Sequence, residues 1–228
     1  MPKSKQTKTK RKQSAPKKDE ALMLACVAQV PFDGWSLAAL TSGGQRYGVD
    51  EAALKTAFPR GVKDLVVAFS AWANDGMLAQ IGKEKLFVKM RTRDKVAFAV
   101  RARLEVLTPH REAMRQLALW YALPHHAPEA LRNLGKLTDS IWQAAGDTST
   151  DFNFYTKRAL LGGVIKATTL YWLQDDSPNQ TETWGFLDRR IAEVLRVGKA
   201  ASQLSDLPAH FGKLKTLSEF FSRFQRAA

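Results

Sequence analysis

The spacing of apolar residues constrains the fold most, because they recur every three or four positions along most of the chain from Asp19 onward. This spacing places them on one face of an α-helix, whereas a half-buried strand has apolar residues at every second position. No stretch shows sustained alternation of that kind with enrichment in β-branched residues. The sequence therefore predicts an all-α fold without a sheet.

Proline and glycine residues divide this helical pattern into segments. The first helix is expected to end at Pro31, and a short second helix, capped by Ser36, is expected to stop at residues 42–44. Asp50 is expected to cap a third short helix over 51–58. Long helices are predicted over 61–80, 85–107, 109–123, 128–145, 153–174 and 181–204. In the helix over 85–107, the basic residues, Arg103 among them, are interpreted as a solvated face, or alternatively as a face that lies against acidic lipid headgroups.

The net charge of +13 is concentrated in residues 1–18, which hold eight of the 35 Lys and Arg residues and no acid. The other 27 basic residues exceed the 22 acidic ones by only five, so the rest of the chain is mildly basic. The first 18 residues also lack Leu, Ile, Val, Phe and Trp, so they cannot bury enough apolar area to offset the entropy of ordering. We expect a disordered basic tail, with attraction to anionic lipid or nucleic acid as the alternative.

What the sequence lacks disfavours several classes of protein. The longest apolar stretch, 65–73, is about half as long as a membrane-spanning helix. Cys26 is the only cysteine and is expected in the core, so the chain cannot form an internal disulfide or a cysteine-based metal cluster. The adjacent His125 and His126 are expected to be exposed rather than metal-bound. With no phosphate-binding glycine loop and no H-E-x-x-H pair, we expect no enzymatic activity, no cofactor and no metal.

Two short helices joined by glycines predict a helix-turn-helix, and residues 47–59 resemble the recognition segment of the TetR family. A DNA reader needs Arg, Lys, Asn or Gln side chains that reach base edges. The predicted recognition helix offers only Lys55, and Asp50 and Glu51 at its start would meet the phosphates with like charge. We therefore expect a retained scaffold and no specific nucleic-acid partner. A TetR-type ligand-responsive DNA-binding transcription regulator is the alternative, and a scaffold with a filled core is a third possibility.

The most distinctive stretch of the sequence runs from residue 146 to residue 191. It contains D-x-N-x-Y-T-K-R at 151–158, Q-D-D-S-P at 174–178 and T-W-G-F-L at 183–187. These three motifs, in this order, resemble the coenzyme Q biosynthesis accessory proteins of the COQ-nine family. The TetR-like N-terminal half is similar to that family as well.

This resemblance implies a TetR-like protein that does no chemistry itself. Members of the family bind isoprenoid or phospholipid molecules in an apolar cavity, associate with membranes, form homodimers and assist the di-iron hydroxylase that acts on demethoxyubiquinone. The chain would then consist of the tail (1–18), a helix-turn-helix-like part (19–80), a helical ligand-binding part (81–204) and an amphipathic C-terminal helix (205–228). Since no targeting segment is recognised, the expected location is cytoplasmic, peripheral at the inner face of the membrane.

The resemblance and the helical spacing together give three sets of candidate site residues. The expected lipid-lining side chains are Trp120, Trp142, Phe154, Leu161, Ile165 and Trp172. The expected surface for the hydroxylase partner is Asp175, Asp176, Glu182 and Trp184. The expected membrane-binding side chains, on the C-terminal helix, are Phe211, Leu214, Leu217, Phe220, Phe221 and Phe224. Four phenylalanines on a basic helix suit insertion at a membrane interface, and docking on the body or on a second subunit is the alternative.

Overall fold

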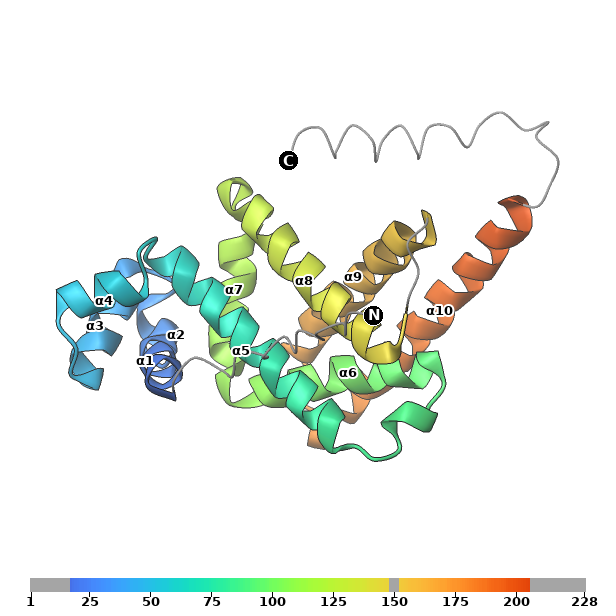
Figure 1. Ribbon diagram of the computed structural model, residues 1–228, viewed down its shortest axis with the longest axis horizontal. Helices are drawn as coiled ribbons and strands as arrows, with labels where there is room; N and C mark the ends of the chain where they lie inside the picture. Colours follow the sequence, from blue (N-terminus) through green and yellow to red (C-terminus); the bar gives the residue numbers. More distant parts are fainter. Residues whose placement is uncertain (1–16, 148–151, 206–228) are drawn as a thin grey trace, which may run out of the picture.

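The computed structural model describes residues 17–147 and 152–205, and every regular element in these ranges is a helix (Figure 1). The predicted all-α fold is therefore confirmed. The N-terminal elements are α1 (Lys17–Val27), α2 (Val30–Asp33), α3 (Leu37–Tyr47), α4 (Glu51–Ala57) and the start of α5 (Val62–Lys83). The body continues with η1 (Phe87–Lys89), α6 (Thr92–Leu107), η2 (Thr108–His110), α7 (Arg111–Ala122), η3 (Pro124–His126), α8 (Ala127–Ala145), α9 (Phe152–Trp172), η4 (Pro178–Gln180) and α10 (Thr181–Ser205).

The helix starts in the N-terminal part follow local capping signals. The Ser36 hydroxyl accepts a hydrogen bond from the backbone N–H of Ala39 at 3.2 Å and begins α3. The Asp50 carboxylate accepts one from the backbone N–H of Ala53 at 2.8 Å and begins α4. Each side chain satisfies an N–H group that has no partner within its helix. Both predicted caps are confirmed.

The predicted stop of α3 at residues 42–44 is wrong, because the helix continues to Tyr47 and ends at Gly48, whose φ is +86°. Gly43 serves close packing instead of termination. A Cβ atom at this position would lie 2.3 Å from the Cα of Cys26 in α1. The glycine therefore lets α3 and α1 approach backbone to backbone, and Cys26 is fully buried at this crossing, as expected.

Two other predicted boundaries need correction. The first helix ends at Val27, and Pro31 lies in the first turn of α2, where its missing N–H costs nothing. The helix predicted over 85–107 is broken, because Met90 and Arg91 have extended backbones and α6 begins only at Thr92. Phe87 in η1 turns back onto α6 and packs edge-on against Phe98, with ring centroids 5.7 Å apart. Burial of this ring explains the break.

Helix α5 joins the two parts of the molecule, since it packs on α1 at one end and on α6 and α8 farther along (Figure 1). The short α2 also contacts the body, where the indole N–H of Trp35 donates to the carbonyl oxygen of Ala113 in α7 at 3.0 Å. A continuous apolar core runs through both parts, from Cys26 to Trp172. No helix in the described ranges is both long enough and apolar enough to cross a membrane.

Candidate functional site

An apolar cavity of about 440 Å³ lies in the helical body, between α5, α6, α7, α8 and α9. This volume lies within the range of small-molecule sites in proteins. Its apolar lining residues are Phe69, Ala73, Leu107, Met114, Leu117, Ala118, Ala122, Ala130, Leu131, Leu134, Leu137, Ile165 and Leu170. Its polar lining residues are Ser70, Arg103, Tyr121, Asn133, Lys166 and Thr169.

The cavity has a buried floor and an accessible mouth. Ala73 and Leu107, on α5 and α6, are completely shielded from solvent. By contrast, Leu131 on α8 and Leu170 on α9 are 52% and 46% exposed, and Lys166 beside them is exposed. The opening therefore lies at α8 and α9 and is bordered by aliphatic side chains and one cation. An amphiphilic molecule can enter there.

Arg103, interpreted from the sequence as part of a solvated face, is half-buried and faces the cavity instead. Its Nε donates to the Oδ1 of Asn74 at 2.9 Å, and its guanidinium also donates to the hydroxyl oxygen of Ser70 at 3.4 Å. Burial lowers the pKa of Arg103 to about 10, so the group stays charged at neutral pH. Arg103 lies three residues after Val100 and four before Leu107, so it shares their buried face of α6, but spacing alone does not show that a cavity lies there.

The structure brings one of the predicted lipid-lining residues, Ile165, to the cavity wall. Leu161 and Trp172 are buried on the same helix but lie outside the lining. Trp172 lies beneath the Arg111 guanidinium, which is 5.5 Å from its ring centroid. The placement of the Phe154 side chain lies outside the described residues.

The two remaining tryptophans of that set pack elsewhere in the body. Trp120 stacks on the ring of His126, with centroids 3.4 Å apart and planes 11° apart. His126 is consequently buried, contrary to the expectation that it is exposed. Trp142 is half-buried beneath the ammonium group of Lys157, which lies 5.6 Å from its ring centroid. Both indoles lie outside the cavity lining.

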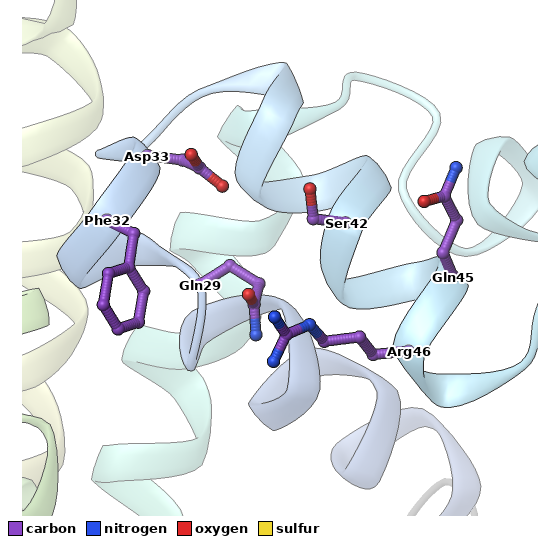
Figure 2. A pocket seen from close by; sticks show the side chains of 6 residues that line it. All are labelled: Gln29, Phe32, Asp33, Ser42, Gln45 and Arg46. Atoms are coloured by element: carbon purple, nitrogen blue, oxygen red, sulfur yellow. The ribbon is translucent and has the colours of Figure 1, made fainter.

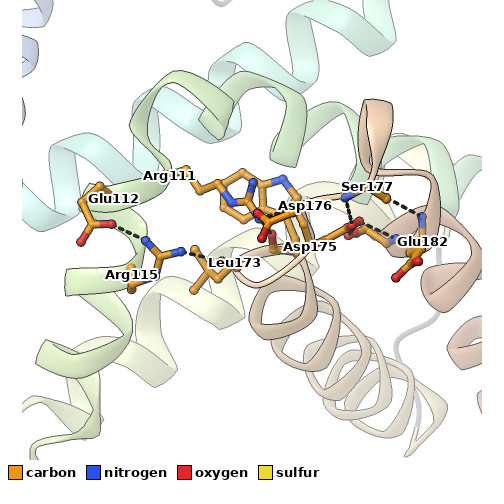
Figure 3. Close-up of polar contacts among 10 residues, drawn as sticks. Arg111, Glu112, Arg115, Leu173, Asp175, Asp176, Ser177 and Glu182 are labelled. Carbon is orange, nitrogen blue, oxygen red and sulfur yellow. Dashed lines mark hydrogen bonds and ion pairs between the residues drawn. The ribbon is translucent and has the colours of Figure 1, made fainter.

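Asp175 organises the turn between α9 and α10, as Figure 3 shows. Its carboxylate, 4% exposed, accepts hydrogen bonds from the backbone N–H groups of Ser177 and Thr183 at 2.8 and 2.9 Å. The hydroxyl of Thr183 donates a third bond at 2.5 Å. Burial raises the pKa of Asp175, but the hydrogen bonds from Ser177 and Thr183 outweigh it and hold the pKa at about 2. The motif 174–178 thus caps the start of α10.

Two arginines at the start of α7 hold the other side of this turn (Figure 3). Arg111 donates to the carbonyl oxygens of Trp172 and Asp175 at 2.6 and 2.5 Å, and Arg115 donates to that of Leu173 at 2.7 Å. Trp172 is the last residue of α9, and Leu173 and Asp175 follow it, so the arginines lie where cations are favourable, at the C-terminal end of the helix. The contacts join residues about sixty positions apart, so sequence spacing could not reveal them.

The other predicted partner-binding residues lie on the outer face of this turn. The side chain of Asp176 is 98% exposed, and Glu182 is also exposed. Trp184 is half-buried, and its indole N–H donates to the carbonyl oxygen of Asn179 at 2.9 Å. The guanidinium of Arg101 lies 4.9 Å from its ring centroid. The accessible part of this turn, which we call the turn surface, therefore consists of Asp176, Glu182 and Trp184. Asp175 supports the turn surface from inside.

The helix-turn-helix face carries few side chains suited to DNA. Lys55 is the one basic residue of α4. Arg60, beside it, is bound to Asp64, with Nε 2.7 Å from Oδ1. A separate open groove, shown in Figure 2, lies between α2 and α3 and has a polar lining with one exposed aromatic ring. Its lining residues are Gln29, Phe32, Asp33, Ser42, Gln45 and Arg46.

The predicted membrane-binding residues lie outside the described residues, as does the C-terminal helix that would carry them. That set therefore stays a prediction.

Comparison with known proteins tests the resemblance to the COQ-nine family. The COQ9 family model matches residues 127–198, which form α8, α9 and most of α10. This segment is similar to the COQ9 family. The human "Ubiquinone biosynthesis protein COQ9, mitochondrial" is 32% identical to the chain over 189 residues, which are 80% of this chain and 59% of the human protein. The Drosophila melanogaster protein of the same name is 34% identical over 190 residues, or 82% of this chain and 58% of that protein. The chain thus spans about three-fifths of the length of these COQ9 relatives, and the resemblance inferred from the motifs is confirmed.

The fold has a solved counterpart. The crystal structure of the TetR transcriptional regulator from Nitrosomonas europaea superimposes with a TM-score of 0.64. The match covers 78% of this chain and 97% of the regulator, at 18% sequence identity. The TetR-like fold expected from residues 47–59 is therefore confirmed.

Proposed function

We propose that this chain is a non-enzymatic, lipid-binding accessory protein of ubiquinone biosynthesis. It binds an isoprenoid quinone precursor or a phospholipid and presents it to the demethoxyubiquinone hydroxylase at a membrane surface. The names of the COQ9 relatives supply the pathway and describe those proteins as mitochondrial. The observation that carries the proposal is the apolar cavity, because two of its walls are α8 and α9, which lie in the segment that the COQ9 family model matches.

The composition of the cavity supports a lipid more than a polar metabolite. Thirteen of its nineteen lining residues are apolar, and aliphatic side chains border its mouth. Moving an isoprenoid or acyl chain from water into such a space is favourable by about 0.8 kcal/mol per methylene group. In this proposal the hydroxylase carries out the reaction, and the chain contributes binding and delivery.

The turn surface is the proposed contact for the hydroxylase. Trp184 offers a large, half-buried ring, and Asp176 and Glu182 are exposed acids of the same segment. An aromatic side chain at the centre of an interface often contributes most of the binding energy. Asp175 supports this surface indirectly, since its carboxylate holds Thr183, next to Trp184, in place.

A pull-down tests the proposed partner surface. Trp184→Lys should lose capture of the hydroxylase, whereas Phe32→Lys, which changes an 84% exposed ring on α2, should retain it. Circular dichroism spectra should be the same for both variants and the wild type. Capture by Trp184→Lys at wild-type strength would exclude this surface.

Membrane attachment is proposed to reside in residues 205–228 and dimer formation in the folded body, both on the strength of the family resemblance. Deletion of 207–228 should abolish flotation with liposomes while leaving the helical content of the body unchanged. Unchanged flotation would assign attachment to another segment.

DNA binding is the other function compatible with the fold. The poverty of basic side chains on α4 and the pairing of Arg60 with Asp64 disfavour it. A gel shift on a palindromic site that survives raised salt would revive it, since contacts to phosphates alone weaken steeply with salt.

The central test is native mass spectrometry of the purified chain, followed by organic extraction of released lipid. We expect a polyprenyl quinone or phospholipid in roughly stoichiometric amount. Ala130→Trp, which fills the cavity from α8, should come without lipid. Ala127→Trp, on the exposed start of the same helix, should keep it. Lipid retained equally by both variants would place the lipid outside the cavity and refute the proposal.

A further inference from the structure

The cavity contains a cation with no anionic partner. No carboxylate oxygen in the described part of the chain lies within 4.0 Å of the Arg103 guanidinium, whose hydrogen-bond partners are the neutral side chains of Asn74 and Ser70. The two buried carboxylates of the described residues have partners. Glu129 is paired with Arg132 at 2.8 Å, and Asp175 accepts three hydrogen bonds. An unpaired charge in an apolar site is costly, so a bound anion would relieve that cost.

The guanidinium also has unused donors. An arginine offers five N–H groups, and the two bonds to Asn74 and Ser70 use two of them. Because Arg103 lines the cavity, the remaining N–H groups are available to a molecule inside it. A planar fork of N–H donors matches the two oxygens of a carboxylate or phosphate.

Tyr121 lines the same cavity as Arg103 and supplies a second donor. Its hydroxyl oxygen accepts a hydrogen bond from the Nδ2 of Asn133 at 2.8 Å, which leaves the hydroxyl proton free to donate. Burial raises the pKa of Tyr121 and the positive charge of Arg103 opposes the rise, so the two groups lie within electrostatic reach of each other. The raised pKa keeps the hydroxyl protonated at neutral pH. Glu129, whose charge also acts on Tyr121, is held by Arg132.

We propose that Arg103 and Tyr121 form a head-group site for the anionic head, carboxylate or phosphate, of a long-chain amphiphile. This inference rests on the proposed lipid-binding function and adds the class of head group and its orientation. Arg103 is bonded to the buried Ser70 and Asn74, whereas the aliphatic Leu131 and Leu170 border the mouth. The head therefore lies at the floor, and the chain runs outward toward α8 and α9.

The site is tested with three probes that have the same hydrocarbon chain and differ in their head groups. The delipidated full-length protein is titrated with oleate, oleyl phosphate and oleyl alcohol by isothermal calorimetry. Wild-type protein should bind the two anions at least tenfold more tightly than the alcohol, because a hydrogen bond to a charged group contributes about 1.5 to 3 kcal/mol. Comparison of oleate with oleyl phosphate identifies which anion the site prefers.

Variants distinguish binding at the head-group site from nonspecific attraction of the anions to positively charged side chains. Arg103→Met should lose the tenfold preference for the anions while leaving the affinity for oleyl alcohol within about threefold. Arg103→Lys should recover part of the preference, and Tyr121→Phe should weaken oleate binding severalfold. Lys136→Gln, which removes an exposed cation of α8 outside the cavity lining, is the matched control and should change oleate binding less than twofold.

The outcomes also distinguish this inference from the lipid-binding proposal. Anion preference retained in Arg103→Met and Tyr121→Phe would refute the head-group site, even if the purified protein carries a lipid. Equal wild-type affinity for all three probes would refute it too. Arg103→Met also leaves the acceptors on the buried Asn74 and Ser70 without their donor, so its fold is checked by circular dichroism before the titrations. If that variant does not fold, Tyr121→Phe alone decides.

Discussion

The turn between α9 and α10 depends on one carboxylate, so substituting Asp175 is expected to destabilise the protein strongly. Asp175→Ala removes the acceptor for three hydrogen bonds, two of them from Thr183, which is completely buried. Each buried donor left without a partner costs about 1 to 3 kcal/mol, and the loss of a helix cap costs about 0.5 to 2 kcal/mol. The Thr183 hydroxyl can rotate toward another acceptor, but its backbone N–H cannot. We therefore expect a loss of about 2 to 4 kcal/mol in the free energy of unfolding.

Urea unfolding followed by circular dichroism measures this loss. With a slope of about 2 kcal/mol per molar urea, the midpoint of Asp175→Ala should fall by about 1 to 2 M. Asp175→Asn keeps one acceptor oxygen and should lie between that variant and the wild type. The neighbouring Asp176→Ala is the control, since its side chain is 98% exposed and its nearest cation, Arg111, is 3.9 Å away. It should change stability by less than about 0.5 kcal/mol. Equal losses in Asp175→Ala and Asp176→Ala would refute the assignment of Asp175 as the capping residue.

Three further predictions follow from contacts described above. The pKa of Asp175 is lowered from 3.8 to about 2 in the folded protein, so its contribution to the free energy of unfolding should be complete above about pH 4 and lost as the pH falls through 2. The urea midpoints of the wild type and Asp175→Ala should therefore converge as the pH is lowered over that interval. Gly43→Ala places a Cβ 2.3 Å from the backbone of Cys26 and should lower the melting temperature by several degrees or prevent folding. The control Gly82→Ala meets nothing within 4 Å in a helix and should stabilise by about 0.5 to 1 kcal/mol. Trp35→Phe removes the 3.0 Å hydrogen bond to α7 and should cost about 1 kcal/mol in thermal or urea unfolding.

Features set by neighbours in the sequence could be predicted, and those set by distant neighbours could not. The caps at Ser36 and Asp50 were predictable because a capping side chain and its N–H partner are three residues apart. Gly43 was interpreted as a helix stop because its use in close packing depends on α1. The break before α6 depends likewise on where the ring of Phe87 is buried, which local spacing does not specify.

The same distinction between local and distant neighbours applies to the residues of the candidate site. Helical spacing identified Ile165 as one inward-facing residue, but it could not show which aromatic rings find other partners, as Trp120 does on His126. Nor could it show that Arg103 lies against Ser70 and Asn74, about thirty residues earlier in the chain. The motifs 174–178 and 183–187 gave the family, and the structure adds that Asp175 in the first motif binds Thr183 in the second.

Helix α7 connects the cavity with the turn between α9 and α10. It is 12 residues long, about 18 Å, and carries the carbonyl-binding Arg111 and Arg115 as well as the cavity-lining Tyr121. The acceptors of these arginines are the backbone carbonyl oxygens of residues 172, 173 and 175. Because they belong to the backbone, these acceptors remain present whichever side chains occupy the three positions.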